Sequence, residues 1–228
     1  MSAWTYTLIP MVAAVIGAAV AVNLRPDPVV VSAIQHFAAG VVFAAAAGEI
    51  LPDLKHAGSP WATLVGGAVG VAAMLGVRTL ERRMKGPVGL MSVTGIDILV
   101  DGLVLGIAFA AGAKAGILLT VALTIEVLFL GLTVANELGE GGASKWKVVG
   151  STAGLVLLLP LGALLGGPIR AMPAAVQGGF LAFGLMALLY LVTEELLVEA
   201  HETEDRPWVT AMFFAGFLLL LLLDEMVG

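Results

Sequence analysis

The sequence contains no cysteine, and only 12% of its 228 residues are charged. The absence of cysteine excludes disulfide frameworks, thiolate metal sites and cysteine nucleophiles. Its 11 Lys and Arg residues are too few for a nucleic-acid-binding surface, so no nucleic acid is expected as a partner. Hydrophobic residues are in excess instead, at 60% with a mean hydropathy of +1.04. This composition indicates an integral membrane protein, whose partner is the lipid bilayer.

Eight apolar runs are long enough to cross a bilayer, whose core of about 30 Å needs about 20 helical residues. Short segments rich in charge, proline or glycine separate these runs. The predicted fold class is all-α: a polytopic membrane protein with eight transmembrane helices in a single integral-membrane domain over residues 1–228. The predicted spans are 4–23, 29–51, 60–78, 88–110, 116–137, 148–166, 176–199 and 208–226.

The basic residues of the loops predict how the chain is oriented. The loops after spans 1, 3, 5 and 7 hold eight Lys and Arg residues, whereas the other three loops hold Lys55, Lys114 and Arg170. Basic residues near span ends are retained on the cytoplasmic side. We therefore expect a multi-pass protein of the cell membrane, an inner or plasma membrane, with its N- and C-termini outside.

Spans 1–3 and 6–8 are predicted to form an inverted repeat around spans 4 and 5, a 3+2+3 arrangement common in transporters. Spans 2 and 7 share a stretch of small residues, 37–40 and 181–184, followed nine or ten residues later by Glu49 or Glu194. Small residues are favoured wherever membrane helices touch, so a chance match is the alternative interpretation.

Acidic residues occur within several spans, whereas all 11 basic residues lie in loops or at span ends. An ionisable group at mid-membrane costs about 2.5–3.5 kcal/mol on insertion scales, so it is expected to face the interior of the bundle and mark an ion or proton path. We expect no Lys or Arg beside these acids, which leaves protons, bound cations or water to neutralise them. The acids within the spans are Asp97, Asp101, Glu126, Glu194, Glu195 and Glu199.

Three of these acids are predicted to meet at the middle of the membrane. The short link between spans 4 and 5 makes them an antiparallel hairpin, which places Asp97, Asp101 and Glu126 at one level. Asp97 and Asp101 are four residues apart, so they share one helix face at a separation of roughly 5–6 Å. That spacing suits two oxygen ligands of one cation.

Other acids are predicted above and below this level. Glu195 and Glu199 form a second pair one turn apart in span 7, while Glu49 and Asp53 lie at the outer end of span 2. Together the acids describe a path across the bilayer. The alternatives are a protonated acid bonded to a backbone carbonyl, solvation for acids near the interface, as we expect for Asp224, and simple packing for His36 in span 2.

Residues 97–103 of span 4 read DILVDGL, with the two acids four residues apart and a glycine after the second. This segment resembles the signature H-N-x-P-E-G-[LM] of the ZIP family of divalent-metal transporters, with Asp97 at the His position and Asp101 at the Glu position. The resemblance continues in the family's order and runs from about residue 29 to the end of the chain. Its further segments are 36–40 and 49–53 with LPD in span 2, 126–132 in span 5, 159–162 in span 6 and 194–201 in span 7.

The chain also departs from the family pattern. Ile98 and Val100 replace the Asn and Pro of span 4, Leu130 and Leu159 replace Glu in spans 5 and 6, and the His-rich loop between spans 3 and 4 is a short basic link. The missing Glu positions argue against the family's two-metal centre, so we expect one main site. The missing proline puts the family's helix kink in doubt.

The resemblance implies transport of a divalent cation by an elevator-like movement of spans 1, 4, 5 and 6 against spans 2, 3, 7 and 8. The cation is then the substrate, and no cofactor is expected. Glu49 and Asp53 would gather cations outside, and His36 would add a nitrogen ligand if spans 2 and 4 pack together. Carboxylate ligands suit Mn²⁺, Mg²⁺, Ca²⁺ or Fe²⁺, although affinity order also favours Zn²⁺. The binding site would comprise Asp97, Asp101 and Glu126, and the inner acceptors would be Glu194, Glu195 and Glu199.

Other functions remain open at this point. The same acids suit a proton-coupled transporter of another solute, or a receptor that binds metal without moving it. An enzyme is not expected, because neither H-E-x-x-H nor G-x-S-x-G occurs. A homodimer is also possible, with the glycines of 66–70 in span 3 supporting contacts between protomers.

Overall fold

The computed structural model describes residues 3–24, 27–56, 59–84, 86–203 and 206–227. Over these residues the protein is all-α with no strand, as predicted. Within these described ranges, eight helical segments are long and apolar enough to cross a membrane, and each predicted span lies within one of them. The chain is therefore a multi-pass membrane protein. Its orientation stays a prediction, and Arg25 and Lys85, which contribute to the loop charge, lie outside the described residues.

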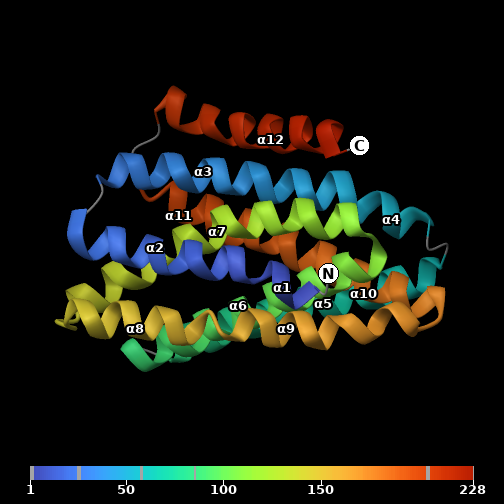
Figure 1. The fold of residues 1–228 in the computed structure, drawn as a ribbon, viewed down its shortest axis with the longest axis horizontal. Coiled ribbons are helices and arrows are strands. Elements are labelled where there is room, and N and C mark those ends of the chain that lie inside the picture. Colours follow the sequence, from blue (N-terminus) through green and yellow to red (C-terminus); the bar gives the residue numbers. More distant parts are fainter. Residues whose placement is uncertain (1–2, 25–26, 57–58, 85, 204–205, 228) are drawn as a thin grey trace.

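The helices follow one another as antiparallel spans (Figure 1). In chain order they are α1 (Ala3–Tyr6) and α2 (Leu8–Leu24); α3 (Pro28–Ala45), a π-helical turn (Ala46–Ile50) and α4 (Leu51–His56); α5 (Pro60–Arg83); α6 (Pro87–Ala111); α7 (Ala113–Glu140); α8 (Lys145–Leu155), α9 (Leu158–Gly166) and a 3-10 turn (Gly167–Ala171); α10 (Ala174–Tyr190), a π-helical turn (Leu191–Leu196) and α11 (Leu197–Ala200); and α12 (Pro207–Val227).

Local sequence explains where the long helices are continuous and where they break. Span 6 is interrupted between α8 and α9, because Pro160 lacks an N–H and its ring clashes with the carbonyl of Val156 four residues earlier. Span 4 has no proline in its middle, and α6 runs through Val100 without a break. The segment that resembles the family's kinked helix is therefore uninterrupted α-helix in α6.

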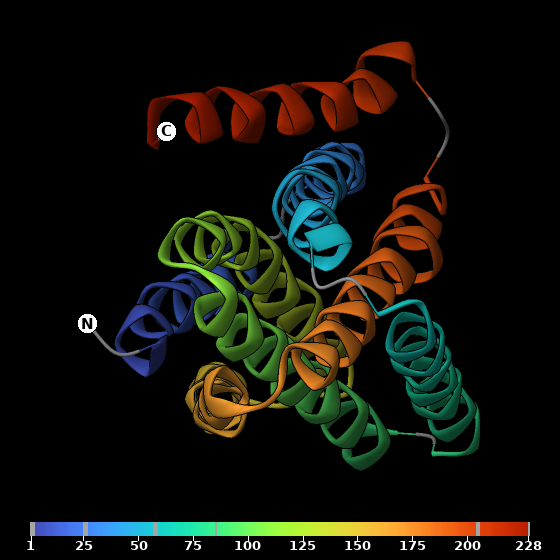
Figure 2. The ribbon, with the colours of Figure 1, turned by 90° about the vertical axis from the view of Figure 1, so that its right-hand side faces the viewer.

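Four spans form the centre of the bundle and position the acids. α3, α6, α7 and α10 belong to the most buried spans, whereas α5 and α12 belong to the least buried. Figure 2 shows α12 and α5 at the periphery, on opposite flanks of these central helices. The span 4, 5 and 7 acids therefore start from the helices that are best shielded from lipid.

Glycines allow the helices of two groups to approach closely. In the first group, α2 packs against α7 and α6 packs against α9. A Cβ atom at Gly17, Gly102, Gly131 or Gly162 would lie 2.1–2.2 Å from a backbone oxygen of the facing helix. In the second group, α3 packs against α12 and α5 packs against α10. Glycine is required at these crossings because any larger residue would force the helix backbones apart.

Within each group, one contact of spans 1–3 is matched by a contact of spans 6–8. Gly17 of span 1 faces the carbonyl of Leu128 in span 5, and Gly162 of span 6 faces the carbonyl of Leu99 in span 4. The two π-helical turns also occupy matching places, one in span 2 and one in span 7. These correspondences are those that an inverted repeat produces. They support the 3+2+3 arrangement, which stays a prediction.

The glycines of span 3 have a partner within the chain. A Cβ atom at Gly66 would lie 1.9 Å from the carbonyl oxygen of Gly179, and one at Gly70 would lie 2.7 Å from that of Phe183, both in α10. Their close contacts are therefore intramolecular, and they join α5 to α10. The homodimer stays a prediction, but these two glycines no longer support it.

Candidate functional site

Two carboxyl groups meet deep in the bundle, between α6 and α7. Asp101 is 4% exposed and Glu126 is 3% exposed, and the two side chains interact directly. Each keeps one buried oxygen, Oδ2 of Asp101 and Oε2 of Glu126, without a hydrogen-bond partner. The hairpin of α6 and α7 produces this meeting, because it places residues equidistant from its turn side by side.

Asp97 lies one turn away from Asp101 on α6. Its carboxyl is half-buried, lies within electrostatic range of Asp101 and Glu126, and also has an unpartnered buried oxygen, Oδ1. The three acids of spans 4 and 5 thus occupy one neighbourhood. In the part of the chain that the structure describes, however, no three Asp, Glu or His side chains converge closely enough to hold a metal ion as placed.

The span 7 acids extend this neighbourhood toward one end of the bundle. Glu195 interacts electrostatically with Asp97, Asp101 and Glu199. Glu199 accepts a hydrogen bond of 2.8 Å from Nε2 of Gln35 in α3. We call this end, where the loops after spans 1, 3, 5 and 7 lie, the basic end; it is on the left of Figure 1.

Two cavities connect Asp97 and the span 7 acids with the basic end. One of about 620 Å³ is lined by Glu137, Glu195 and Glu199 among others, and reaches Pro28 and Glu202 at the helix ends. A second, of about 250 Å³, extends along Glu137, Glu195 and Glu199 to Asp97. The acids therefore line a polar route from the basic end to the middle of the bundle.

The sequence did not reveal that Glu81 and Glu137 belong to this route. Both line the smaller cavity, and Glu81 interacts electrostatically with Asp97, Glu195 and Glu199. Glu81 lies beyond the predicted end of span 3 at residue 78, and Glu137 is the last residue of predicted span 5, so neither was counted among the acids within the spans. The structure continues α5 to Arg83 and α7 to Glu140, which brings both residues into helices that face the cavity.

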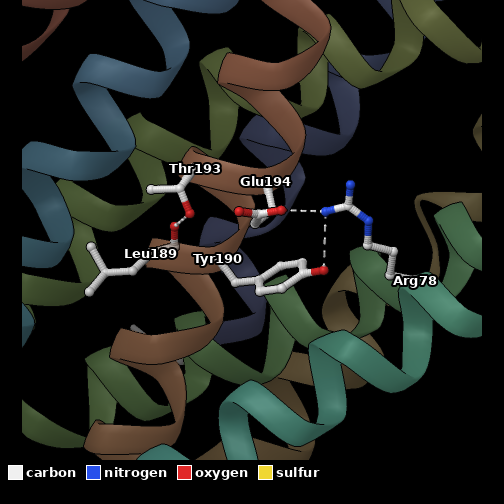
Figure 3. Close-up of polar contacts among 5 residues, drawn as sticks. All are labelled: Arg78, Leu189, Tyr190, Thr193 and Glu194. Carbon is white, nitrogen blue, oxygen red and sulfur yellow. Dashed lines mark hydrogen bonds and ion pairs between the residues drawn. The ribbon is translucent and has the colours of Figure 1, made fainter.

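Glu194 has a basic partner, so the expectation that no Lys or Arg neutralises the span acids is wrong at this residue. Arg78 of α5 donates a hydrogen bond of 2.5 Å to Oε2 of Glu194 and a longer one of 3.5 Å to the hydroxyl of Tyr190 (Figure 3). Arg78 is the last residue of predicted span 3, and its long side chain reaches across to Tyr190 and Glu194 of span 7. Glu194 therefore has a different electrostatic role from its neighbour Glu195.

His36 lies apart from this pairing, at the contact of α3 with α11. Its ring is 2% exposed, and its Nδ1 is 2.9 Å from the carbonyl oxygen of Ser32. The ring centroid is 4.9 Å from that of His201, and Nε2 is buried without a hydrogen-bond partner. The structure thus places His36 in a histidine pair, and a role as cation ligand stays a prediction.

The entrance acids lie at the opposite end from the basic end. Glu49 is in the π-helical turn of span 2 and Asp53 is in α4, and the two interact electrostatically. Asp224 of α12 adds a third acid, but it pairs with Lys114 of α7 at 2.6 Å rather than being simply solvated. Sequence reasoning missed this pair because its members are far apart in the chain.

Two zinc transporters share sequence similarity with the chain. The chain is 32% identical over 131 residues to zinc transporter ZIPB of Bordetella bronchiseptica, and this aligned region covers 57% of this chain and 42% of that protein. The chain is 30% identical over 129 residues to zinc transporter GufA of Myxococcus xanthus, and this aligned region covers 56% of this chain and 51% of that protein. The chain is a remote relative of the ZIP family.

The ZIP relationship is partial in extent. The chain spans about half the length of the curated relatives that it matches. No protein-family model matches it. The low identity agrees with the departures at Ile98 and Val100, where α6 continues as regular helix through the segment that resembles the ZIP signature.

Proposed function

We propose that this protein transports divalent metal cations across the bilayer through a carboxylate site between α6 and α7. The observation that carries the proposal is the contact of Asp101 with Glu126, two buried carboxyls that each keep an unpartnered oxygen. Leaving such oxygens without a partner in a dry interior is costly, so a positive ligand would stabilise them. The zinc-transporter names of the two relatives support a metal cation as that ligand.

The chemistry of the site favours hard or borderline cations. Asp97, Asp101 and Glu126 supply oxygen ligands only, which suits Mn²⁺ and Fe²⁺, while Zn²⁺ is also bound by carboxylates. Among the described residues, the ion pairs Arg78–Glu194 and Lys114–Asp224 do not involve these three acids. A cation would draw the three carboxyls together, because it replaces their mutual repulsion with attraction to a common centre.

The cavities give the cation a way to the basic end. Glu195, Glu199 and Glu137 line the route, and their negative charge keeps the local concentration of cations high along it. At the other end, Glu49 and Asp53 would collect cations before they enter. The loop charges predict that the basic end is cytoplasmic, so the structure would correspond to an inward-open state.

An elevator-like movement fits the two packing groups. The glycine crossings described above lie within one group or the other, spans 1, 4, 5 and 6 or spans 2, 3, 7 and 8. Each group would therefore move as a rigid body, because tightly packed backbones transmit displacement rather than absorbing it. The carboxylate site lies in the first group, and Glu195 and Glu199 lie in the second.

Flux into liposomes tests the proposal. Purified protein in sealed liposomes is expected to load Mn²⁺ or Zn²⁺ down a concentration gradient, read by an internal metal-sensitive dye. Flux that follows a pH gradient without any binding of divalent cation would favour the proton-coupled alternative instead. Binding without flux would identify a metal receptor.

Neighbouring glutamates in span 7 give a matched pair of variants. We expect Glu195→Gln to lower cation flux by about tenfold or more, because it removes a charge that faces Asp97 along the route. Glu194→Gln is expected to lower flux less than Glu195→Gln, because Glu194 pairs with Arg78 and does not line the smaller cavity that reaches Asp97. Initial rates in liposomes measure both. Equal losses in the two variants would contradict the assigned route.

The Lys114–Asp224 pair joins the two packing groups at the end away from the basic end. Lys114→Gln is expected to raise the equilibrium constant for opening at that end by up to about fivefold, because an exposed ion pair contributes at most about 1 kcal/mol. Labelling of Thr120→Cys by a membrane-impermeant thiol reagent measures the opening, and the cysteine-free chain gives no background. Arg78→Gln is the control, because it breaks a pair within one group. An unchanged labelling rate in Lys114→Gln would refute the link between this pair and opening.

A further inference from the structure

A surface groove lies between α5 and α10, and its lining residues belong to these two helices and to the π-helical turn that follows α10. It encloses about 580 Å³, and its α5 wall includes Leu75, Arg78 and Arg82. Leu189 and Tyr190 belong to the opposite wall. Leu75 is 51% exposed, and α5 is among the least buried spans, so the groove opens toward lipid. It is separate from the proposed cation site.

The groove has an apolar part and a cationic part. Val71 and Leu75 lie on the same face of α5 as Arg78 and Arg82, one turn apart in succession toward the basic end. Arg82 is the penultimate residue of α5, which places it at the level of the lipid headgroups. An apolar wall that leads to arginines at headgroup level has the polarity pattern of a phospholipid.

The two arginines differ in their partners. Glu194 and Tyr190 fix the guanidinium of Arg78, which leaves further N–H groups free to donate. Arg82 has no hydrogen bond or ion pair with any residue of the part of the chain that the structure describes. The hydroxyl of Tyr190 accepts from Arg78 and retains its own proton for donation. The groove therefore presents several donors and a surplus of positive charge at one place.

We propose that this groove binds one anionic phospholipid, with its phosphate at Arg82 and Arg78 and one acyl chain along Val71, Leu75 and Leu189. Charge complementarity selects an anionic headgroup. The predicted cytoplasmic position of the basic end places the groove in the leaflet where anionic lipids attract basic residues. The apolar wall selects a lipid over a free anion, because a phosphate ion would leave it uncovered.

The proposed lipid would also reach the acid-lined cavity through one residue. Arg78 and Glu194 line both the groove and the 620 Å³ cavity, so this ion pair forms the partition between them. A phosphate that shares Arg78 would weaken its hold on Glu194. The lipid is thus placed to adjust the charge at the wall of the cavity, while its binding does not depend on whether the protein transports a metal.

Two arginines of the same helical turn provide the test. Native mass spectrometry of detergent-purified protein would measure retention of phosphatidylglycerol against phosphatidylcholine with the same acyl chains. We expect selective retention of one phosphatidylglycerol, weakened about fivefold by Arg82→Gln. Arg83→Gln removes the same charge from the adjacent residue, which does not line the groove, and is expected to retain the lipid as the wild type does. Equal losses in the two variants would show general surface attraction and overturn the proposal.

Two further measurements separate binding of an anionic lipid from binding of a free anion or of any phospholipid. Leu75→Trp fills the apolar part from an exposed position that tolerates a large side chain, and it is expected to reduce retention without lowering the melting temperature. Unchanged retention in this variant would overturn the acyl-chain contact and with it the proposal. Millimolar inorganic phosphate is expected not to displace the lipid. Displacement by phosphate, or equal retention of phosphatidylcholine, would overturn it as well.

Discussion

Replacing Asp101 with Asn, or Glu126 with Gln, is expected to lower divalent-cation flux by about 100-fold while leaving the protein at least as stable as the wild type. Each change keeps the shape of the side chain and removes its charge. The two carboxyls are buried, interact with each other and lack a basic partner among the described residues. Neutralising one relieves their repulsion in the apo protein and removes a ligand from the proposed site.

The opposite signs of these two effects make the prediction specific. A residue needed only for folding would lose flux and stability together. Flux is measured in liposomes, and stability by thermal unfolding in detergent with and without Mn²⁺ or Zn²⁺. The wild type is expected to melt higher with the cation, because a ligand that binds only the folded state stabilises it, and the two variants are expected to lose that increase. Glu225→Gln, at an exposed residue of α12, is the control. Unchanged flux in both variants would remove these acids from the mechanism.

Replacing Gly66 with Ala is expected to destabilise the fold by about 1–3 kcal/mol or more, the usual cost of overpacking. The new Cβ would lie 1.9 Å from the carbonyl oxygen of Gly179, and backbone cannot yield there without moving α5 away from α10. Gly76→Ala in the same helix is the matched control, since nothing lies within 4 Å of its Cβ position. That control is expected to be neutral or to stabilise by about 0.5–1 kcal/mol, because alanine favours helix.

Thermal unfolding of the two alanine variants in detergent measures this difference. Size-exclusion chromatography with light scattering gives the oligomeric state in the same samples. If Gly66 instead lies between protomers, Gly66→Ala will shift the protein toward monomer without lowering its melting temperature. That outcome would contradict the packing of α5 on α10 and restore the glycines of 66–70 as support for a homodimer.

The contacts of the acids differ in whether the sequence alone could predict them. The meeting of Asp101 with Glu126 follows from the length of two spans and the short link between them, so it was predictable from spacing. The role of Glu194 was not. Glu194 and Glu195 are adjacent in the sequence, yet one contacts Arg78 and the other faces Asp97. Only the rotation of the helix about its axis separates them, and neighbouring helices set that rotation.

The sequence by itself determined the number of spans and where each lies. The reason is that every segment crossing a bilayer must be apolar and must satisfy its own backbone hydrogen bonds, and both requirements are local to the segment. Only the tertiary structure decided which charges meet. Residues that are distant in the chain meet in two ion pairs, Arg78–Glu194 and Lys114–Asp224. Residues that are distant in the chain also line one cavity, where Glu81 and Glu137 join the span acids. These contacts depend on the depth at which the helices cross and on the rotation of each helix about its axis. Both are set by backbone packing between helices at glycines such as Gly17 and Gly66.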